Sequence, residues 1–129
     1  MRIAIVGCRG PRAIKIGETI DHYRRICDDA YAFACALPEG TIIVSGGAEG
    51  VDQCARLAAK RYPGRLQIEE HLPDYEKYAP ARAPLARNLI IVERSDEIHA
   101  WPAPWSRGTW HTINEGRKAG KPVTVHEVK

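Results

Sequence analysis

Short, fully apolar segments alternate along the chain with longer segments in which apolar residues recur every three or four positions. The short segments are typical of strands covered on both faces, and the longer ones of helices that pack one side on a sheet. The predicted strands are Arg2 to Val6, Thr41 to Val44, Leu66 to Glu70, Glu97 to Trp101 and Pro122 to His126. The predicted helices are Glu18 to Leu37, Val51 through Ala58, Pro84 through Val92 with Leu85, Leu89 and Ile90, and Thr109 to Ala119.

This alternation predicts an α/β fold with a parallel sheet and right-handed crossovers. Leu66 to Glu70 is more polar than the other predicted strands, which indicates a position at the edge of the sheet. A ligand crevice is expected at the carboxyl ends of the strands, where the strand order reverses. At 129 residues the chain is expected to form a single domain, residues 1–129.

The composition favours a cytoplasmic protein. The formal net charge is +3, and no run of like charges resembles a nucleic-acid-binding tail or a polybasic membrane patch. The apolar segments are much shorter than the roughly 18 residues of a membrane helix, and the N-terminus lacks a signal-peptide pattern. The 4 cysteines and 5 histidines show no metal-ligand spacing, so no metal site and no cofactor are expected.

A glycine-rich turn, SGGAEGVD from Ser45 to Asp52, follows the second predicted strand and opens a helix. Helix N-termini present free N–H groups and a partial positive charge, so such a turn suits an anion. Arginines in glycine- or proline-broken segments near predicted strand ends add positive charge: Arg9, Arg12, Arg82, Arg87 and Arg107. These features together predict an anion site, and phosphate is the favoured anion.

Standard fingerprints argue against several common classes of enzyme. GCRGPR after the first strand is not GxGxxG, and the second strand ends in Ser45 rather than an acidic residue, which disfavours an NAD dehydrogenase. GxxxxGK followed by Ser or Thr is absent, as are HExxH and GxSxG. P-loop NTPases and the common hydrolase templates are therefore disfavoured.

Four motifs follow the first four predicted strands: IVGCRGP, VSGGAEGVD, PDYEKYAPARAPLARN and SRGTWHTINEG. In this order they resemble the SLOG superfamily, which unites the Rossmann-like domain of DNA-processing protein A with the Lonely Guy phosphoribohydrolases. The resemblance spans essentially the whole chain and is to the small YspA/YpsA-like branch in particular. It implies a Rossmann-like three-layer α/β/α fold with a mainly parallel sheet of about five strands. It also implies a nucleotide or nucleotide-derived ligand and a homodimer or higher homo-oligomer.

The resemblance further implies roles for individual residues. The glycine turn would bind phosphate or ribose through its backbone, and the loop at the last helix would hold a 5′-phosphate, as in the phosphoribohydrolases. Arg87 and Asn88 match a motif whose arginine supports cleavage of the N-glycosidic bond in those enzymes. The ligand-binding residues expected from these motifs are Gly7, Arg9, Gly10, Ser45, Gly46, Gly47, Gly50, Asp52, Arg87, Asn88, Ser106, Arg107, Gly108 and Thr109.

One departure from the family pattern concerns catalysis. The hydrolases read GTxxE, whereas Thr112 stands here at the position of the glutamate. A hydroxyl cannot exchange its proton or stabilise an oxocarbenium-like centre as a carboxylate does. Glu115 lies nearly one turn further along the helix and could substitute only if the ligand sat differently. Arg87 and Glu115 are the candidate catalytic residues, and whether the chain is an enzyme stays open.

Other side chains allow two interpretations each. Asp52 either contacts the ligand or complements the helix dipole, and Glu49 either points to solvent or accepts a ribose hydroxyl. Trp105 either stacks on a base or anchors a dimer, and His111 is either a surface residue or an acid–base group. Cys8 has no evident base beside it in the sequence, so it is not predicted to be a nucleophile.

Three functions are consistent with these observations. The leading hypothesis is binding or sensing of a nucleotide-derived small molecule through the glycine-rich loops and arginines, with a separate effector protein as output partner. The alternative is a nucleoside 5′-monophosphate phosphoribohydrolase of the Lonely Guy type. Single-stranded DNA binding is the third, and the modest charge and the lack of a basic, aromatic-lined stripe disfavour nucleic acid.

Overall fold

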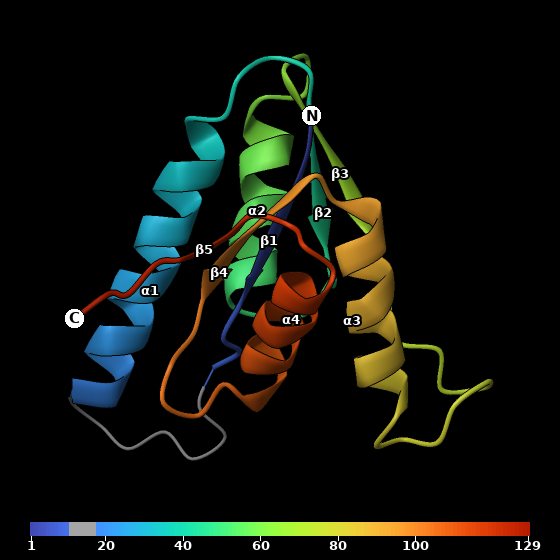
Figure 1. Cartoon of the computed structure of the whole chain (residues 1–129). Helices are drawn as coiled ribbons and strands as arrows, with labels where there is room; N and C mark the ends of the chain where they lie inside the picture. Colours follow the sequence, from blue (N-terminus) through green and yellow to red (C-terminus); the bar gives the residue numbers. More distant parts are fainter. Residues whose placement is uncertain (11–17) are drawn as a thin grey trace.

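The computed structural model describes residues 1–10 and 18–129. Five strands form one sheet in the order β3-β2-β1-β4-β5, and each neighbouring pair is parallel. The strands are β1 (Arg2–Gly7), β2 (Thr41–Ser45), β3 (Leu66–Glu70), β4 (Glu97–Trp101) and β5 (Val123–Val125). The helices are α1 (Glu18–Cys35), α2 (Val51–Arg61), α3 (Ala83–Arg94) and α4 (Arg107–Lys118). The predicted Rossmann-like α/β fold with a parallel sheet is confirmed (Figure 1).

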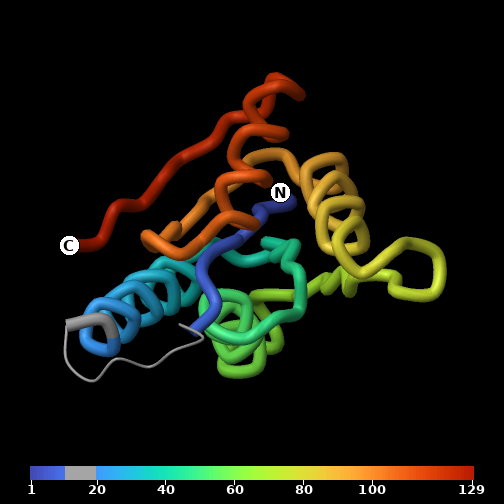
Figure 2. Tube along the Cα trace, turned by 90° about the horizontal axis from the view of Figure 1, so that it is seen from below, coloured from blue at the N-terminus to red at the C-terminus, as the bar shows by residue number. Residues whose placement is uncertain are grey.

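Helices cover both faces of the sheet. α1 packs beside α2 on one face and α3 beside α4 on the other (Figure 2). β1 serves both layers because successive side chains of a strand point to opposite faces. Ile3 and Ile5 join the core under α1 and α2, whereas Ala4 and Val6 join the core under α3 and α4. Burial on both faces explains why every residue from Ile3 to Val6 is apolar.

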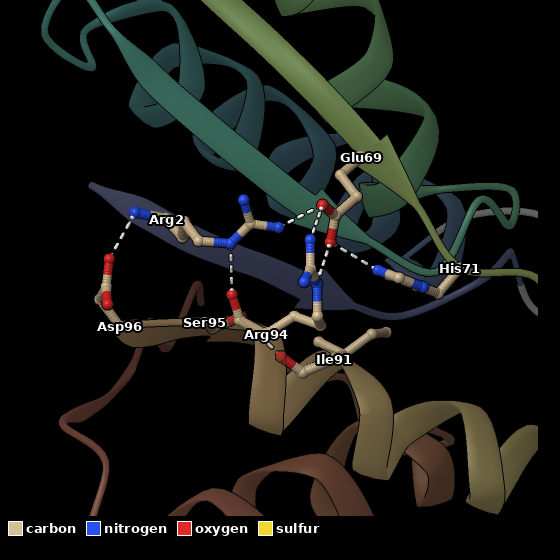
Figure 3. A network of polar contacts seen from close by, with 7 residues as sticks. All are labelled: Arg2, Glu69, His71, Ile91, Arg94, Ser95 and Asp96. Carbon is tan, nitrogen blue, oxygen red and sulfur yellow. Dashed lines mark hydrogen bonds and ion pairs between the residues drawn. The ribbon is translucent and has the colours of Figure 1, made fainter.

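The polar strand β3 lies at the edge of the sheet, as its sequence predicts. Its Glu69 accepts hydrogen bonds from Arg2 at the start of the chain, from Arg94 at the end of α3 at 2.6 Å, and from His71 at 2.6 Å (Figure 3). Arg94 and Arg2 hold the pKa of the Glu69 carboxyl well below its usual range. The network therefore ties the edge strand to β1 and α3.

α3 leaves several of its apolar residues exposed. Leu85, Leu89 and Ile90 are 42%, 49% and 44% exposed, whereas the next two residues along the chain are buried. Because apolar residues stand on both sides of this helix, the sequence does not show which side is buried. One turn earlier, Arg87 and Asn88 occupy the inner side of the helix, where they face a cavity.

The strand order reverses between β1 and β4, so the loops that follow these strands diverge. The carboxyl ends of the strands point to the lower edge of the molecule in Figure 1, where the first turns of α3 and α4 also lie. Among the helices that the structure describes, none has both the length and the apolar character required to span a membrane.

Candidate functional site

A cavity of about 640 Å³ opens at this edge, between the loops after β1 and β2 and the first turns of α3 and α4. Its size falls within the roughly 300–1,000 Å³ that small-molecule sites occupy. Of the ligand-binding residues expected from the sequence, those that line it are Gly7, Arg9, Gly10, Gly46, Asp52, Arg87, Asn88, Ser106, Arg107, Gly108 and Thr109. The fold thus brings residues from separate segments of the chain to one hollow.

Three residues of the glycine turn are placed elsewhere. Ser45 is fully buried at the end of β2, and Gly47 faces a neighbouring cavity. Gly50 has a φ of +77°, and a Cβ on it would lie 2.3 Å from the carbonyl oxygen of Cys8. Arg12 lies outside the described residues, and Arg82 is exposed immediately before α3.

Several amides of the glycine turn already have partners within the protein. The N–H of Val51 donates to the carbonyl of Cys8 at 3.2 Å, and the N–H of Ala48 donates to Asp52 Oδ2 at 3.1 Å. The Asp52 carboxyl thus occupies the place that an anion would take on the Ala48 amide. Gly46 serves packing, because a Cβ there would lie 2.7 Å from Arg87 Nη1.

Arg87 is 8% exposed and is held in place by backbone oxygens. Its Nη1 donates to the carbonyls of Gly46 at 2.7 Å and His71 at 3.3 Å, and its Nε donates to Asn88 Oδ1 at 3.0 Å. Burial lowers the pKa of the guanidinium, and the charge of Arg9 lowers it further against the opposing effect of Asp52. Among the described residues, Arg87 Nη2 has no hydrogen-bond partner.

Asp52 supplies the only carboxyl that lines this cavity among the residues that the structure describes. It is 7% exposed, and burial raises its pKa from 3.8 to about 6, against the hydrogen bond from Ala48 and the charges of Arg87 and Arg9. At neutral pH it is therefore protonated part of the time, and it can accept or donate a proton. Asp52 also stands in the first turn of α2, so the position fits both interpretations of this residue.

The first turn of α4 is open. Ser106 precedes the helix, but its hydroxyl accepts a hydrogen bond from the Ala103 N–H at 2.8 Å and does not cap α4. The first N–H groups of the helix have no acceptor within it and are available to a ligand. A Cβ at Gly108 would meet nothing within 4 Å. Thr109 is 6% exposed, and its hydroxyl has no partner among the described residues.

Of Glu115 and Thr112, only Thr112 reaches the cavity. Glu115 does not line the cavity among the described residues, and it pairs with Lys118 at 3.3 Å on the side of α4. Thr112 does line the cavity, but its hydroxyl donates back to the Gly108 carbonyl at 3.3 Å. Asp52 is therefore the carboxyl that is placed for catalysis, although the sequence suggested it as a ligand contact or as a complement to the helix dipole.

Several further residues of the wall were missed or left open in the sequence. They are Val6, Cys8, Ala48, Pro84, Leu85, Ile91, Trp105 and Thr112. The Trp105 indole N–H donates to the Arg9 carbonyl at 2.8 Å, so this ring joins the loops after β1 and β4. Most of them carried a signal, since all but Ile91 and Trp105 stand in the four motifs.

Cys8 and His111 have structural contacts. Burial raises the pKa of the Cys8 thiol to about 12, so it is protonated at neutral pH and is a poor nucleophile. His111 Nδ1 lies 3.2 Å from Asn88 Nδ2 and helps to position that amide. Within the described residues, no cluster of three or more metal-ligating side chains has the arrangement to hold an ion.

Comparison with known proteins identifies a relative by sequence. No family model matches the chain. The Gene 61 protein of Mycobacterium phage D29 is 37% identical over 90 residues, which are 67% of this chain and 71% of that protein.

Three solved structures have the same fold. TM1055, a structural genomics target, aligns with a TM-score of 0.63 and 19% identity over 95% of this chain and 71% of its own. DNA processing protein A from Streptococcus pneumoniae aligns with a TM-score of 0.59 and 18% identity over 96% of this chain. DNA processing protein A from Helicobacter pylori, whose structure is described with a single-stranded DNA binding mode, aligns with a TM-score of 0.63 and 22% identity over 97% of this chain. The chain covers 49% and 64% of these last two. The likeness to DNA processing protein A agrees with the fold of the SLOG superfamily.

Proposed function

The chain belongs to the family of the Gene 61 protein of Mycobacterium phage D29, and we propose that it binds a nucleotide or nucleotide-derived small molecule at the carboxyl edge of its sheet. The observation that carries this proposal is the uncapped N-terminus of α4, which opens on a cavity that also contains Arg9 and Arg87. We assign the chain to the small YspA/YpsA-like branch of the SLOG superfamily on the order of its motifs.

The first turn of α4 suits a phosphate. Its free amides and the helix dipole favour an anion, and the open space at Gly108 lets an oxyanion approach the backbone closely. The Thr109 hydroxyl and the Arg107 side chain line the same hollow and can add hydrogen bonds. The apolar side chains of Val6, Leu85 and Ile91 also line the cavity and can cover a nucleoside.

Binding requires no catalytic carboxylate, which accords with Thr112 at the position of the family's glutamate. A protein of this kind acts as a sensor when the ligand changes its affinity for a separate effector protein. This interpretation also accommodates Asp52, because a carboxyl with a pKa of about 6 is neutral often enough to lie beside a bound phosphate.

Calorimetric titration with AMP, CMP and GMP tests the proposal. Arg107→Ala is expected to weaken the binding of the responsive nucleotide by about tenfold, because a charge-assisted hydrogen bond is lost. Arg117→Ala is the matched control, since Arg117 is an exposed arginine in the last turn of the same helix and does not line the cavity. Absence of binding by all three nucleotides, or equal losses in the two variants, would refute the proposal.

Asp52 also favours a second candidate, the nucleoside 5′-monophosphate phosphoribohydrolase. A carboxyl that is partly protonated at neutral pH can donate a proton to the departing base, and the nearby Arg87 can stabilise the phosphoribosyl group. Purified protein incubated with the same nucleotides would then release free base. Turnover that disappears in Asp52→Asn and persists in Glu115→Gln would support hydrolysis, whereas undiminished nucleotide in the wild type argues for binding alone.

A further inference from the structure

A second cavity of about 370 Å³ adjoins the first. The two share four lining residues, Arg9, Gly46, Ala48 and Arg87, so only one wall lies between them. The remaining lining of the second cavity comes from the glycine turn, from α2 and from the loop after β3: Gly47, Glu49, Gln53, Arg56, Leu72, Pro73 and Tyr75. A ligand that fills both cavities must therefore pass the shared wall.

The shared wall carries two like charges. Arg9 and Arg87 line both cavities and so bring two guanidinium groups to the shared wall, and Arg87 Nη2 has no hydrogen-bond partner among the described residues. Asp52 supplies one carboxyl against these two positive charges, and it lines the first cavity but not the second. An anionic group placed between the two guanidinium groups would relieve their repulsion and supply the missing acceptor.

The second cavity itself is not a phosphate site. Its third arginine, Arg56, is already paired with Glu70 at 2.7 Å and donates to the Gly47 carbonyl at 3.3 Å. Glu49 stands exposed at the same cavity and would repel a phosphate. A carboxylate instead suits the hydroxyl groups of a sugar, and the 58% exposed ring of Tyr75 offers a flat apolar surface to a sugar ring.

We infer that the two cavities form one bipartite site for a nucleoside diphosphate sugar. The nucleoside lies in the first cavity, the diphosphate lies between the first turn of α4 and the Arg9–Arg87 wall, and the second sugar contacts Glu49 and Tyr75. This inference rests on the proposed nucleotide binding and adds to it a second subsite. It also gives a role to Glu49, whose charge is out of place in a loop that binds phosphate alone.

Calorimetry with three probes tests the second subsite: AMP, ADP and ADP-ribose. ADP and ADP-ribose share the nucleoside and the diphosphate, so the difference between them reports on the second sugar. ADP-ribose is expected to bind the wild type about tenfold more tightly than ADP, as two or three added hydrogen bonds would give. Glu49→Gln and Tyr75→Ala are each expected to remove most of this gain while leaving the affinity for ADP undiminished.

Glu76→Gln is the matched control, since Glu76 is exposed in the loop after β3 and does not line either cavity. If AMP or ADP binds and ADP-ribose binds no more tightly than ADP, the second subsite is refuted while nucleotide binding stands. Equal losses of ADP and ADP-ribose in Glu49→Gln would refute it as well. If none of the three probes binds, the proposed function fails, and this inference fails with it.

Discussion

Replacing Asp52 by asparagine should stabilise the protein at neutral pH. Burial raises the pKa of this carboxyl from 3.8 to about 6, so the folded state holds the proton more tightly than the unfolded chain does. Ionisation at higher pH therefore costs folding free energy. Asparagine has the shape of the protonated acid and keeps an oxygen for the Ala48 N–H, but it cannot ionise.

The magnitude follows from the two pKa values. A difference of one in pKa corresponds to about 1.4 kcal/mol, so the rise from 3.8 to about 6 corresponds to about 3 kcal/mol. The stability of the wild type relative to the variant is greatest below pH 4, where Asp52 is protonated in both states. This relative stability declines between pH 4 and pH 6 and is constant at higher pH. There the free energy of unfolding of the variant exceeds that of the wild type by about 3 kcal/mol, which corresponds to roughly 10 °C in Tm.

Urea unfolding followed by circular dichroism, at pH values from 4 to 8, measures this difference directly. Asp21→Asn is the control, because Asp21 is exposed on α1 and its replacement should leave the profile parallel to that of the wild type. The reasoning is refuted if Asp52→Asn is less stable than the wild type at pH 7, or if the difference between them does not change with pH.

Two further substitutions test other contacts by the same unfolding measurements. Gly50→Ala should lower stability by about 2 kcal/mol or more, because φ is +77° and the new Cβ would meet the Cys8 carbonyl oxygen. Gly64→Ala, where nothing lies within 4 Å, should change stability by less than about 1 kcal/mol, and similar values for the two would contradict the packing at Gly50. Glu69→Gln should cost about 1–2 kcal/mol at pH 7, because the carboxylate accepts charge-assisted hydrogen bonds from Arg94 and Arg2. That cost should shrink as the pH falls below about 4.5 and should shrink further toward the depressed pKa of folded Glu69, and a cost at pH 3 equal to that at pH 7 would show that charge is not its cause.

The strands and their connections could be predicted because burial on both faces leaves a simple mark in the sequence. Ile43 and Val44 of β2 are both fully buried, on opposite faces of the sheet, so the middle of the strand is apolar on both sides. The inner side of α3 could not be predicted in the same way. There the apolar Leu89 and Ile90 are exposed, and the polar Arg87 and Asn88 are buried against a cavity that only the assembled fold creates.

The candidate site was predictable as a set of segments but not as a set of contacts. Parallel strands bring the loops after β1, β2 and β4 to one edge, so their motifs meet there. Whether an amide in such a loop is free depends on distant groups: Ala48 is occupied by Asp52, and the first turn of α4 is open because the Ser106 hydroxyl serves Ala103. The spacing of residues in the sequence shows neither that the Ala48 amide has a partner nor that the first turn of α4 is open.

Three features that oppose folding coincide in this one cavity. A carboxyl is buried with a raised pKa, two guanidinium groups of like charge line one wall, and a helix N-terminus is left without a side-chain cap. Elsewhere the charges agree with the fold, as at Glu69, where the ion pairs stabilise the carboxylate. A bound phosphate would relieve the repulsion and cap the helix, and it would favour the protonated form of Asp52. Because one ligand corrects all three, they are better explained by selection for anion binding than by chance, and the Asp52→Asn variant separates the stability cost from that function.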